Sequence, residues 1–268
     1  MGVKDRDLDR LVQEEIMLLL MSADLVEDIQ IYPEIDSTNR EAKAQVEAGA
    51  THGTVILAER QIAGKGRQGR SFFSPRGTGL YMSFVLDSKQ LGFHNPVAIT
   101  AYAAVCVCET IEKICHVYPV IKWVNDVFLN SRKICGILTE VITVSENEDT
   151  NKMILGIGIN VSVKQEDFPK ELRDIATSIY PEGTSLVTRN QLAAEIINRV
   201  LCADKPDEAK LFLQYKARLF MLNTEIIVVQ GKEKYKAISL DVNEYGQLIV
   251  RTLEGEIKTL VFGEVQIL

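Results

Sequence analysis

The sequence lacks any apolar run long enough to cross a membrane. Its longest run near the start, Ile16–Met21, is far shorter than the ~20 residues that a bilayer span needs. No basic stretch precedes this run and no small-residue cleavage site follows it, which argues against a secretory signal peptide. The 268 residues are 46% hydrophobic and 25% charged, which excludes a disordered or low-complexity chain. We therefore expect a cytoplasmic globular protein with one large domain, or a medium and a small one.

The chain also lacks the cysteine pattern of a metal site. It has five cysteines, none in a CxxC pair, and only three histidines. The cysteines are Cys106, Cys108, Cys115, Cys135 and Cys202. Because their number is odd and their neighbours are apolar, we expect buried reduced thiols rather than a zinc site or a disulfide framework.

An excess of positive charge is missing as well. The chain has 37 acidic and 30 basic side chains, giving a net charge of −7. Nucleic-acid-binding proteins normally show a basic balance or a basic face, so DNA is not expected as the main partner. Residues 7–29 are predicted to form one amphipathic helix that packs on the rest of the chain. Tyr32-Pro33 follows too soon for a helix-turn-helix module.

The remaining pattern predicts an α/β protein with a small all-β tail. We expect helices at residues 40–49, 96–114, 188–202 and 207–220, and strands at 54–59, 79–86, 120–123, 127–129, 133–144 and 153–161. A polar turn is expected at 146–152 and irregular chain at 164–185. Short strands at 226–229, 235–241, 247–252 and 257–262 then predict a small barrel. Since so short a chain buries little core alone, the barrel should lean on the larger domain, with a boundary near residue 222.

The stretch from Glu59 to Arg70 combines glycines with cationic side chains. Five cations and no acid lie between Arg60 and Arg76 of this acidic protein. Glycines let backbone amides approach an anion, and arginine adds paired donors suited to phosphate or carboxylate. The spacing fits neither GxxxxGK[ST] nor GxGxxG. An anion-binding loop and a solvated basic loop therefore both stay open.

Two further segments carry polar residues at strand ends. Asp126 follows Lys122 and precedes Lys133 on the return strand of a predicted hairpin, where a carboxylate could hold Mg²⁺ beside phosphates. A surface turn with one Asp–Lys pair is the alternative. Residues 156–160 place two glycines and Asn160 in a buried strand, which indicates either a close ligand or tight strand packing.

Taken together, these segments resemble the biotin protein ligases. The motifs are DSTN at 36–39, AERQIAGKGRQGR at 58–70, FFSP at 72–75, KWVNDVFLNSRKICGILTE at 122–140 and GIGIN at 156–160. They follow the family's order and spacing, and the resemblance covers roughly residues 30–268. It implies a fold like that of class II aminoacyl-tRNA synthetases over residues 30–221, with a mixed or antiparallel sheet, and an SH3-like barrel over 222–268. It also implies activation of biotin by ATP and Mg²⁺ to biotinyl-5′-AMP, then transfer of biotin to a lysine of a carboxylase carrier domain.

The resemblance assigns roles to matching positions. The biotin-binding positions are Ser37, Thr38, Asn39, Gln61, Lys65, Gly66, Arg67, Lys133, Gly136, Leu138, Gly156 and Gly158. The ATP-binding positions are Arg67, Arg70, Lys122, Asn125, Asp126 and Asn160. Arg67, Lys133 and Asp126 are the expected catalytic residues, with Asp126 tied to Mg²⁺.

Some positions depart from the family pattern. Lys65 and Gln68 stand where many members have arginine, and Leu268 stands where some members have arginine. Phe72 replaces a common tryptophan, and Val124 replaces a common proline. These changes bear on ATP affinity more than on the reaction type.

Little chain precedes the first motif, so no operator-binding repressor activity is expected. The expected partner is the carrier domain, with no nucleic acid and no membrane, and an exposed sheet edge could form a homodimer. A lipoate or octanoate ligase, a non-catalytic biotin sensor and a nucleic-acid-binding module are the alternatives.

Overall fold

The computed structural model describes residues 9–93, 95–143, 151–202 and 207–267, and its main body is built on a mixed sheet. The sheet has seven strands in the order β1-β2-β3-β7-β6-β5-β4. Their bounds are β1 Asp28–Tyr32, β2 Thr54–Ala58, β3 Gly79–Asp87, β4 Val120–Lys122, β5 Asp126–Leu129, β6 Arg132–Thr143 and β7 Asn151–Asn160. Only β1 and β2 run parallel among the paired neighbours of this sheet. The predicted α/β class with a mixed sheet is confirmed.

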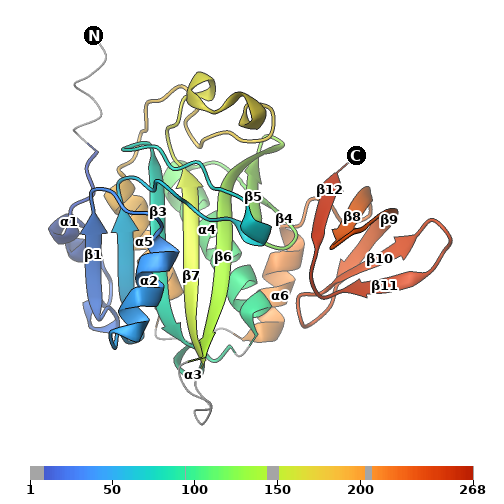
Figure 1. Cartoon of the computed structure of the whole chain (residues 1–268), viewed down its shortest axis with the longest axis horizontal. Helices are drawn as coiled ribbons and strands as arrows, with labels where there is room; N and C mark the ends of the chain where they lie inside the picture. Colours follow the sequence, from blue (N-terminus) through green and yellow to red (C-terminus); the bar gives the residue numbers. More distant parts are fainter. Residues whose placement is uncertain (1–8, 94, 144–150, 203–206, 268) are drawn as a thin grey trace.

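Helices cover both faces of this sheet (Figure 1). The short helix α2, Thr38–Glu47, packs on the front face against β2, β3 and β7. The long apolar helix α4, Pro96–Cys115, lies behind with α5, Arg189–Val200, and α6, Glu208–Ala217. Asn95 caps α4 by accepting from the Val97 amide, and proline opens its first turn. Helix α3 is a single turn, Ser88–Leu91.

Strand alternation decides where the core lies. On β3 and β7 the even-numbered Leu80, Met82 and Phe84 and the odd-numbered Leu155 and Ile157 belong to the main core with α4 and α5. On the opposite face, Val85 and Ile154 pack against α2 in a smaller core, while Ser83, Gly156 and Gly158 add little bulk. These small residues leave room for a site beside α2.

The predicted helix over residues 7–29 is wrong in most of its length. In the described part, only α1, Gln13–Leu18, is α-helical there; a 3₁₀ turn at Ala23–Leu25 follows, and residues 28–32 form β1. β1 pairs with β2 in the register Ile29↔Val55 and Ile31↔Leu57, so sheet hydrogen bonds outweigh the helical pattern. Just after the C-terminal end of α1, Asn198 accepts from the Met21 amide and donates to the Leu19 carbonyl. These bonds end α1 earlier than the sequence pattern predicts.

Residues 225–267 form a second sheet of five antiparallel strands, in the order β11-β10-β9-β8-β12. The strands are β8 Glu225–Gln230, β9 Glu233–Val242, β10 Leu248–Thr252, β11 Ile257–Leu260 and β12 Glu264–Ile267. The sequence prediction missed β12, which pairs with β8. The division of the chain into 30–221 and 222–268 stays a prediction.

The second sheet shares an apolar core with the main body, and polar contacts, three of them through a tryptophan, a lysine and an arginine side chain, join the two. Trp123 Nε1 donates to the Gly246 carbonyl at 2.9 Å, and Lys216 Nζ lies 2.6 Å from Asp241 Oδ1. The third contact joins Arg70 to Glu264 and is described with the site below.

The other predicted elements are confirmed, and each end lies within three residues of its expected position. Residues 164–185 are irregular as expected, with single 3₁₀ turns at Gln165–Asp167 and Lys170–Leu172. Of the turn predicted at 146–152, residues 146–150 lie outside the described part, as does Leu268, while residues 151–152 belong to β7 rather than to a turn. Across the described ranges, no helix is both long and apolar enough to cross a bilayer.

Candidate active site

A small hollow lies on the front face of the main sheet, between α2 and the basic loop. Four separate segments line it, and all twelve predicted biotin-binding positions are among the lining residues. They are Ser37, Thr38, Asn39, Gln61, Lys65, Gly66, Arg67, Lys133, Gly136, Leu138, Gly156 and Gly158, joined by Phe72, Asn125, Ile137 and Ile157. The motifs that were separate in sequence therefore meet in one place.

One end of the hollow is a buried hydrogen-bond network at the start of α2. Gln61 Oε1 accepts from the Thr38 amide at 2.8 Å and from Thr38 Oγ1 at 3.1 Å. Ser83 Oγ, from the middle of β3, lies 2.7 Å from both Thr38 Oγ1 and Asn39 Oδ1 and donates to these acceptors. Because Thr38, Asn39 and Ser83 are all buried, their hydroxyl and amide groups are fixed in place before any ligand arrives.

Glycines form the floor of the hollow. Gly136 of β6 faces Gly158 of β7, and Leu138 faces Gly156. A Cβ at Gly156 would overlap Asn39 Oδ1, and one at Gly158 would lie 2.7 Å from the Phe72 ring. The two β7 glycines are therefore needed for space: they let the α2 side chains and an aromatic ring reach the sheet.

The basic loop closes over the hollow as a tight turn. The Gly66 amide donates to the Arg70 carbonyl at 2.7 Å, and the Phe72 amide donates to the Gly64 carbonyl at 2.8 Å. The Arg67 guanidinium donates to Asn125 Oδ1 at 3.2 Å. Burial lowers the pKa of Arg67, although the Asp126 charge opposes this shift. The cation at this end of the hollow is thus partly removed from water.

A carboxylate with two lysines lies beside Arg67. Lys133 Nζ is 2.6 Å from Asp126 Oδ1, and Lys122 Nζ is 3.9 Å from Asp126 Oδ2. Burial lowers the pKa of Lys122, while the Asp126 charge works against this effect. Asp126 and the two lysines therefore form a partly buried cluster, which differs from the solvated surface turn that was the alternative. No group of three or more His, Cys, Asp or Glu in the described residues could hold a metal ion, so Asp126 is a lone carboxylate here.

Four of the predicted ATP-binding residues do not line the hollow itself. Lys122 and Asp126 lie beside the hollow, because Asp126 contacts both Lys122 and Lys133, and Lys133 is a lining residue. Arg70 points to the second sheet, where its Nη1 donates to Glu264 Oε1 at 2.9 Å, and this hydrogen bond raises its pKa. Asn160 donates to the Thr177 carbonyl at 3.0 Å, and its buried Oδ1 has no hydrogen-bond partner among the residues that the structure describes.

Several residues of this region carried no usable sequence signal. Ser83 sits within an apolar strand, and its contacts with Thr38 and Asn39 in the folded chain place it at the site. Glu264 lies far along the chain from Arg70. Tyr215 of α6 is buried and donates to the Val124 carbonyl at 2.9 Å, which supports the turn before Asp126.

Comparison with known proteins identifies the class. The model of the Biotin/lipoate A/B protein ligase family matches residues 32–160. The chain is 32% identical over 242 residues to the bifunctional ligase/repressor BirA of Bacillus spizizenii, covering 87% of this chain and 72% of that protein. It is 25% identical over 228 residues to a biotin–[acetyl-CoA-carboxylase] ligase of Mycobacterium tuberculosis, covering 82% of each.

A solved structure agrees with these sequence relatives. The biotin protein ligase from Aquifex aeolicus in complex with biotin and ATP superposes with a TM-score of 0.74 at 30% identity, covering 90% of this chain and 98% of that one. The fold and the site thus define a ligase of small carboxylic acids. The chain belongs to the biotin protein ligase family.

Proposed function

We propose that this chain activates biotin with ATP to biotinyl-5′-AMP and then transfers biotin to a lysine of a carboxylase carrier domain. The observation that carries the proposal is the arrangement of the hollow. Fixed, uncharged polar groups lie at one end, glycines form the floor, and Arg67 and Lys133 stand at the other end. Biotin has an uncharged ring and a side chain that ends in a carboxylate, and this order of groups matches the order in the hollow.

The first half-reaction joins two anions. A carboxylate oxygen of biotin attacks the α-phosphorus of ATP, the bond from that phosphorus to the bridging oxygen breaks, and pyrophosphate leaves with the electron pair. Repulsion between the anions must be offset, and charge grows on the phosphoryl oxygens. Arg67 and Lys133 supply preorganised cations there.

The second half-reaction needs mainly positioning. The neutral lysine amine of the carrier attacks the acyl carbon, a proton is lost, and AMP leaves with the oxygen that joined it to biotin. No enzyme nucleophile is required for either step.

Magnesium fits one place in this cluster. Mg²⁺ commonly uses one or two carboxylates together with substrate phosphates, and Asp126 offers such a carboxylate beside the two lysines. With ATP present, Asp126 would hold the ion, which supplies positive charge to the phosphates.

The proposal is tested by pyrophosphate release. Purified protein is incubated with ATP and Mg²⁺, and in parallel with biotin, lipoate, octanoate or no acid. Of these acids, we expect only biotin to cause release of pyrophosphate, and we expect mass spectrometry to detect biotinyl-5′-AMP. Release with lipoate or octanoate in place of biotin would overturn the substrate, and silence with all acids despite biotin binding would favour a sensor.

A serine outside the predicted set should affect biotin affinity. Ser83→Ala removes the donor to Asn39 Oδ1 and Thr38 Oγ1, so we expect the dissociation constant for biotin to rise by about 3–10-fold. Titration calorimetry measures this. Ser239→Ala is the matched control, because Ser239 is equally buried and donates to the Met221 carbonyl away from the site. Equal affinity in both variants would remove Ser83 from the account.

The absence of repressor activity, a homodimer and a cytoplasmic location stay predictions. Direct DNA binding with a steep salt dependence would contradict the first of them.

A further inference from the structure

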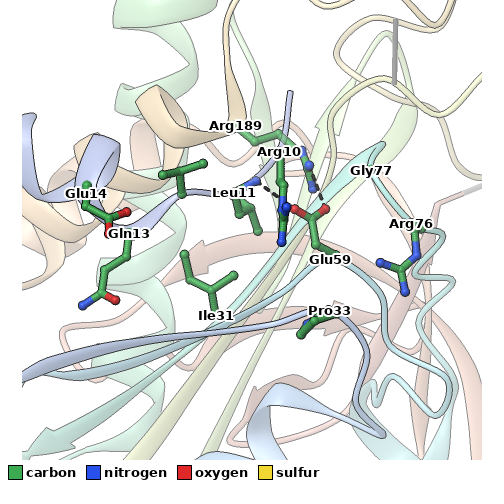
Figure 2. A pocket seen from close by; sticks show the side chains of 11 residues that line it. Arg10, Leu11, Gln13, Glu14, Ile31, Pro33, Glu59, Arg76, Gly77 and Arg189 are labelled. Carbon is green, nitrogen blue, oxygen red and sulfur yellow. Dashed lines mark hydrogen bonds and ion pairs between the residues drawn. The ribbon is translucent and has the colours of Figure 1, made fainter. Parts of the chain in front are cut away.

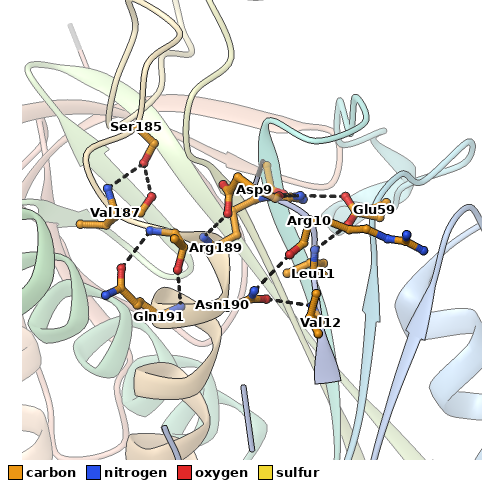
Figure 3. Close-up of polar contacts among 12 residues, drawn as sticks. Asp9, Arg10, Leu11, Val12, Glu59, Ser185, Val187, Arg189, Asn190 and Gln191 are labelled. Atoms are coloured by element: carbon orange, nitrogen blue, oxygen red, sulfur yellow. Dashed lines mark hydrogen bonds and ion pairs between the residues drawn. The ribbon is translucent and has the colours of Figure 1, made fainter. Parts of the chain in front are cut away.

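A buried arginine lies outside the hollow, at the start of α5. The Arg189 side chain is 1% exposed. Its Nε lies 3.3 Å from Asp9 Oδ2, and its Nη2 donates to Glu59 Oε2 at 2.8 Å and to the Asp9 carbonyl (Figure 3). Its Nη1 donates to the Gly79 carbonyl at 3.1 Å. Because an unpaired buried cation is costly, these partners hold the side chain firmly in one place.

Two of these partners stand at the two ends of one loop. The chain leaves β2 at Glu59 and enters β3 at Gly79, and residues 59–78, here called the ligand loop, contain Gln61, Lys65, Gly66 and Arg67. The Gly77 amide donates to the Glu59 carbonyl at 3.3 Å, which closes the base of the loop. Arg189 therefore bonds to both ends of the ligand loop, at Glu59 after β2 and at Gly79 where β3 begins.

The third partner belongs to the N-terminal segment, residues 9–12. The Leu11 amide donates to Glu59 Oε1 at 2.8 Å, so both oxygens of this carboxylate are used. Asn190 accepts from the Val12 amide at 3.1 Å and donates to the Arg10 carbonyl at 3.0 Å. The same segment, together with Glu59 and Arg189, lines a cavity of about 690 Å³ (Figure 2). The segment is held by these polar contacts and by the burial of Leu11 in the main core.

Glu59 is two residues from Gln61, the acceptor for the Thr38 amide and hydroxyl in the hollow. A displacement of Glu59 would therefore move Gln61. We propose that Arg189 is a positioning residue for the ligand loop: through Glu59 and Gly79 it sets the base of the loop and hence the place of Gln61, with Asp9 completing the cluster. The link to biotin affinity rests on the proposed function; the link to loop order does not.

Glu59→Gln tests the proposal with little change of shape. The Gln amide nitrogen would face Arg189 Nη2 or the Leu11 amide, placing two donors against each other. In the free protein, we expect faster hydrogen exchange at the loop amides of Gly66 and Phe72, which are bonded within the loop. With biotin, we expect the dissociation constant to rise about tenfold or more, while kcat for pyrophosphate release at saturating biotin changes little.

Asp9→Asn is the second, milder variant. It keeps an acceptor for the Arg189 amide but weakens the ion pair, and Asp9 is partly exposed, so the fold should tolerate it. We expect the same changes at reduced size, and this variant decides the question if Glu59→Gln does not fold.

Glu195→Gln is the matched control on the same helix. Glu195 is also buried and bonds Lys113 and Arg199, each at 2.9 Å, away from the ligand loop. It should lower the unfolding temperature without altering exchange at Gly66 and Phe72 or the affinity for biotin.

The proposal is overturned if Glu59→Gln and Asp9→Asn leave loop exchange unchanged, or if Glu195→Gln increases it equally. A wild-type protein that releases no pyrophosphate with biotin would refute the proposed function instead. In that case, exchange in the free protein still decides the positioning role.

Discussion

Replacing Lys133 by alanine is expected to slow formation of biotinyl-5′-AMP by about 10²–10³-fold, equal to about 3–4 kcal/mol. Lys133 lines the hollow and contacts Asp126 at 2.6 Å, so its ammonium stands where charge develops on the phosphoryl oxygens. The variant also leaves Asp126 with only the more distant Lys122 at 3.9 Å. Single-turnover measurement of adenylate formation separates this effect from substrate binding.

Lys216→Ala is the matched control for the lysine. Lys216 Nζ makes an ion pair of the same length, 2.6 Å, with Asp241 Oδ1, but on the contact with the second sheet. Its loss should leave adenylation close to the wild-type rate. A Lys133→Ala protein that adenylates biotin at the wild-type rate would remove Lys133 from the reaction.

Replacing Arg67 by alanine is expected to release the adenylate from the site. Arg67 belongs to the turn that closes the hollow and bonds Asn125, and its half-buried guanidinium is the cation placed to hold the phosphate. We expect the lifetime of bound biotinyl-5′-AMP to fall by about 10–100-fold, the scale of one charge-assisted hydrogen bond. Rapid filtration of protein loaded with labelled adenylate measures this lifetime.

Arg67→Lys serves as an intermediate variant, and Arg76→Ala serves as the control. The lysine variant keeps the charge but loses the planar fork, so its adenylate lifetime should lie between wild type and alanine. Arg76 is an exposed cation near the loop's end that pairs with Glu34 at 3.6 Å outside the hollow, and its loss should have no effect. Equal retention in wild type and Arg67→Ala would contradict the role given to Arg67.

The meeting of these residues in one hollow follows from their concentration in short motifs. The loop at 64–70, the hairpin at 125–138 and the glycines of β7 each contain several lining residues, and the resemblance to the biotin protein ligases grouped these motifs before the fold was known. Arg70 differs, because its orientation depends on Glu264 of a strand, β12, that the sequence did not reveal. β12 has only four residues and follows a break at Gly263, whose φ is 138°.

The N-terminal region could not be predicted for a different reason. Residues 8–20 have helical apolar spacing, but residues 9–12 are held in an extended form by groups about 180 residues away along the chain. Arg189 and Asn190, placed by the fold of α5, supply those bonds together with Glu59. Ser83 shows the same limit on a smaller scale, since a serine in an apolar strand gains meaning only from its neighbours in space.

In the proposed reaction, the biotin carboxylate attacks the α-phosphorus of ATP in this hollow. Biotin labelled by oxygen-18 in its carboxylate reveals the position of attack when it is incubated with ATP, Mg²⁺ and protein, with hydroxylamine as the amine acceptor. Attack at the α-phosphorus predicts that AMP carries a single oxygen-18 atom after each turnover, seen by mass spectrometry, and that pyrophosphate carries none. Release of ADP and labelled inorganic phosphate, without AMP or pyrophosphate, would show attack at the γ-phosphorus and would contradict the proposed reaction.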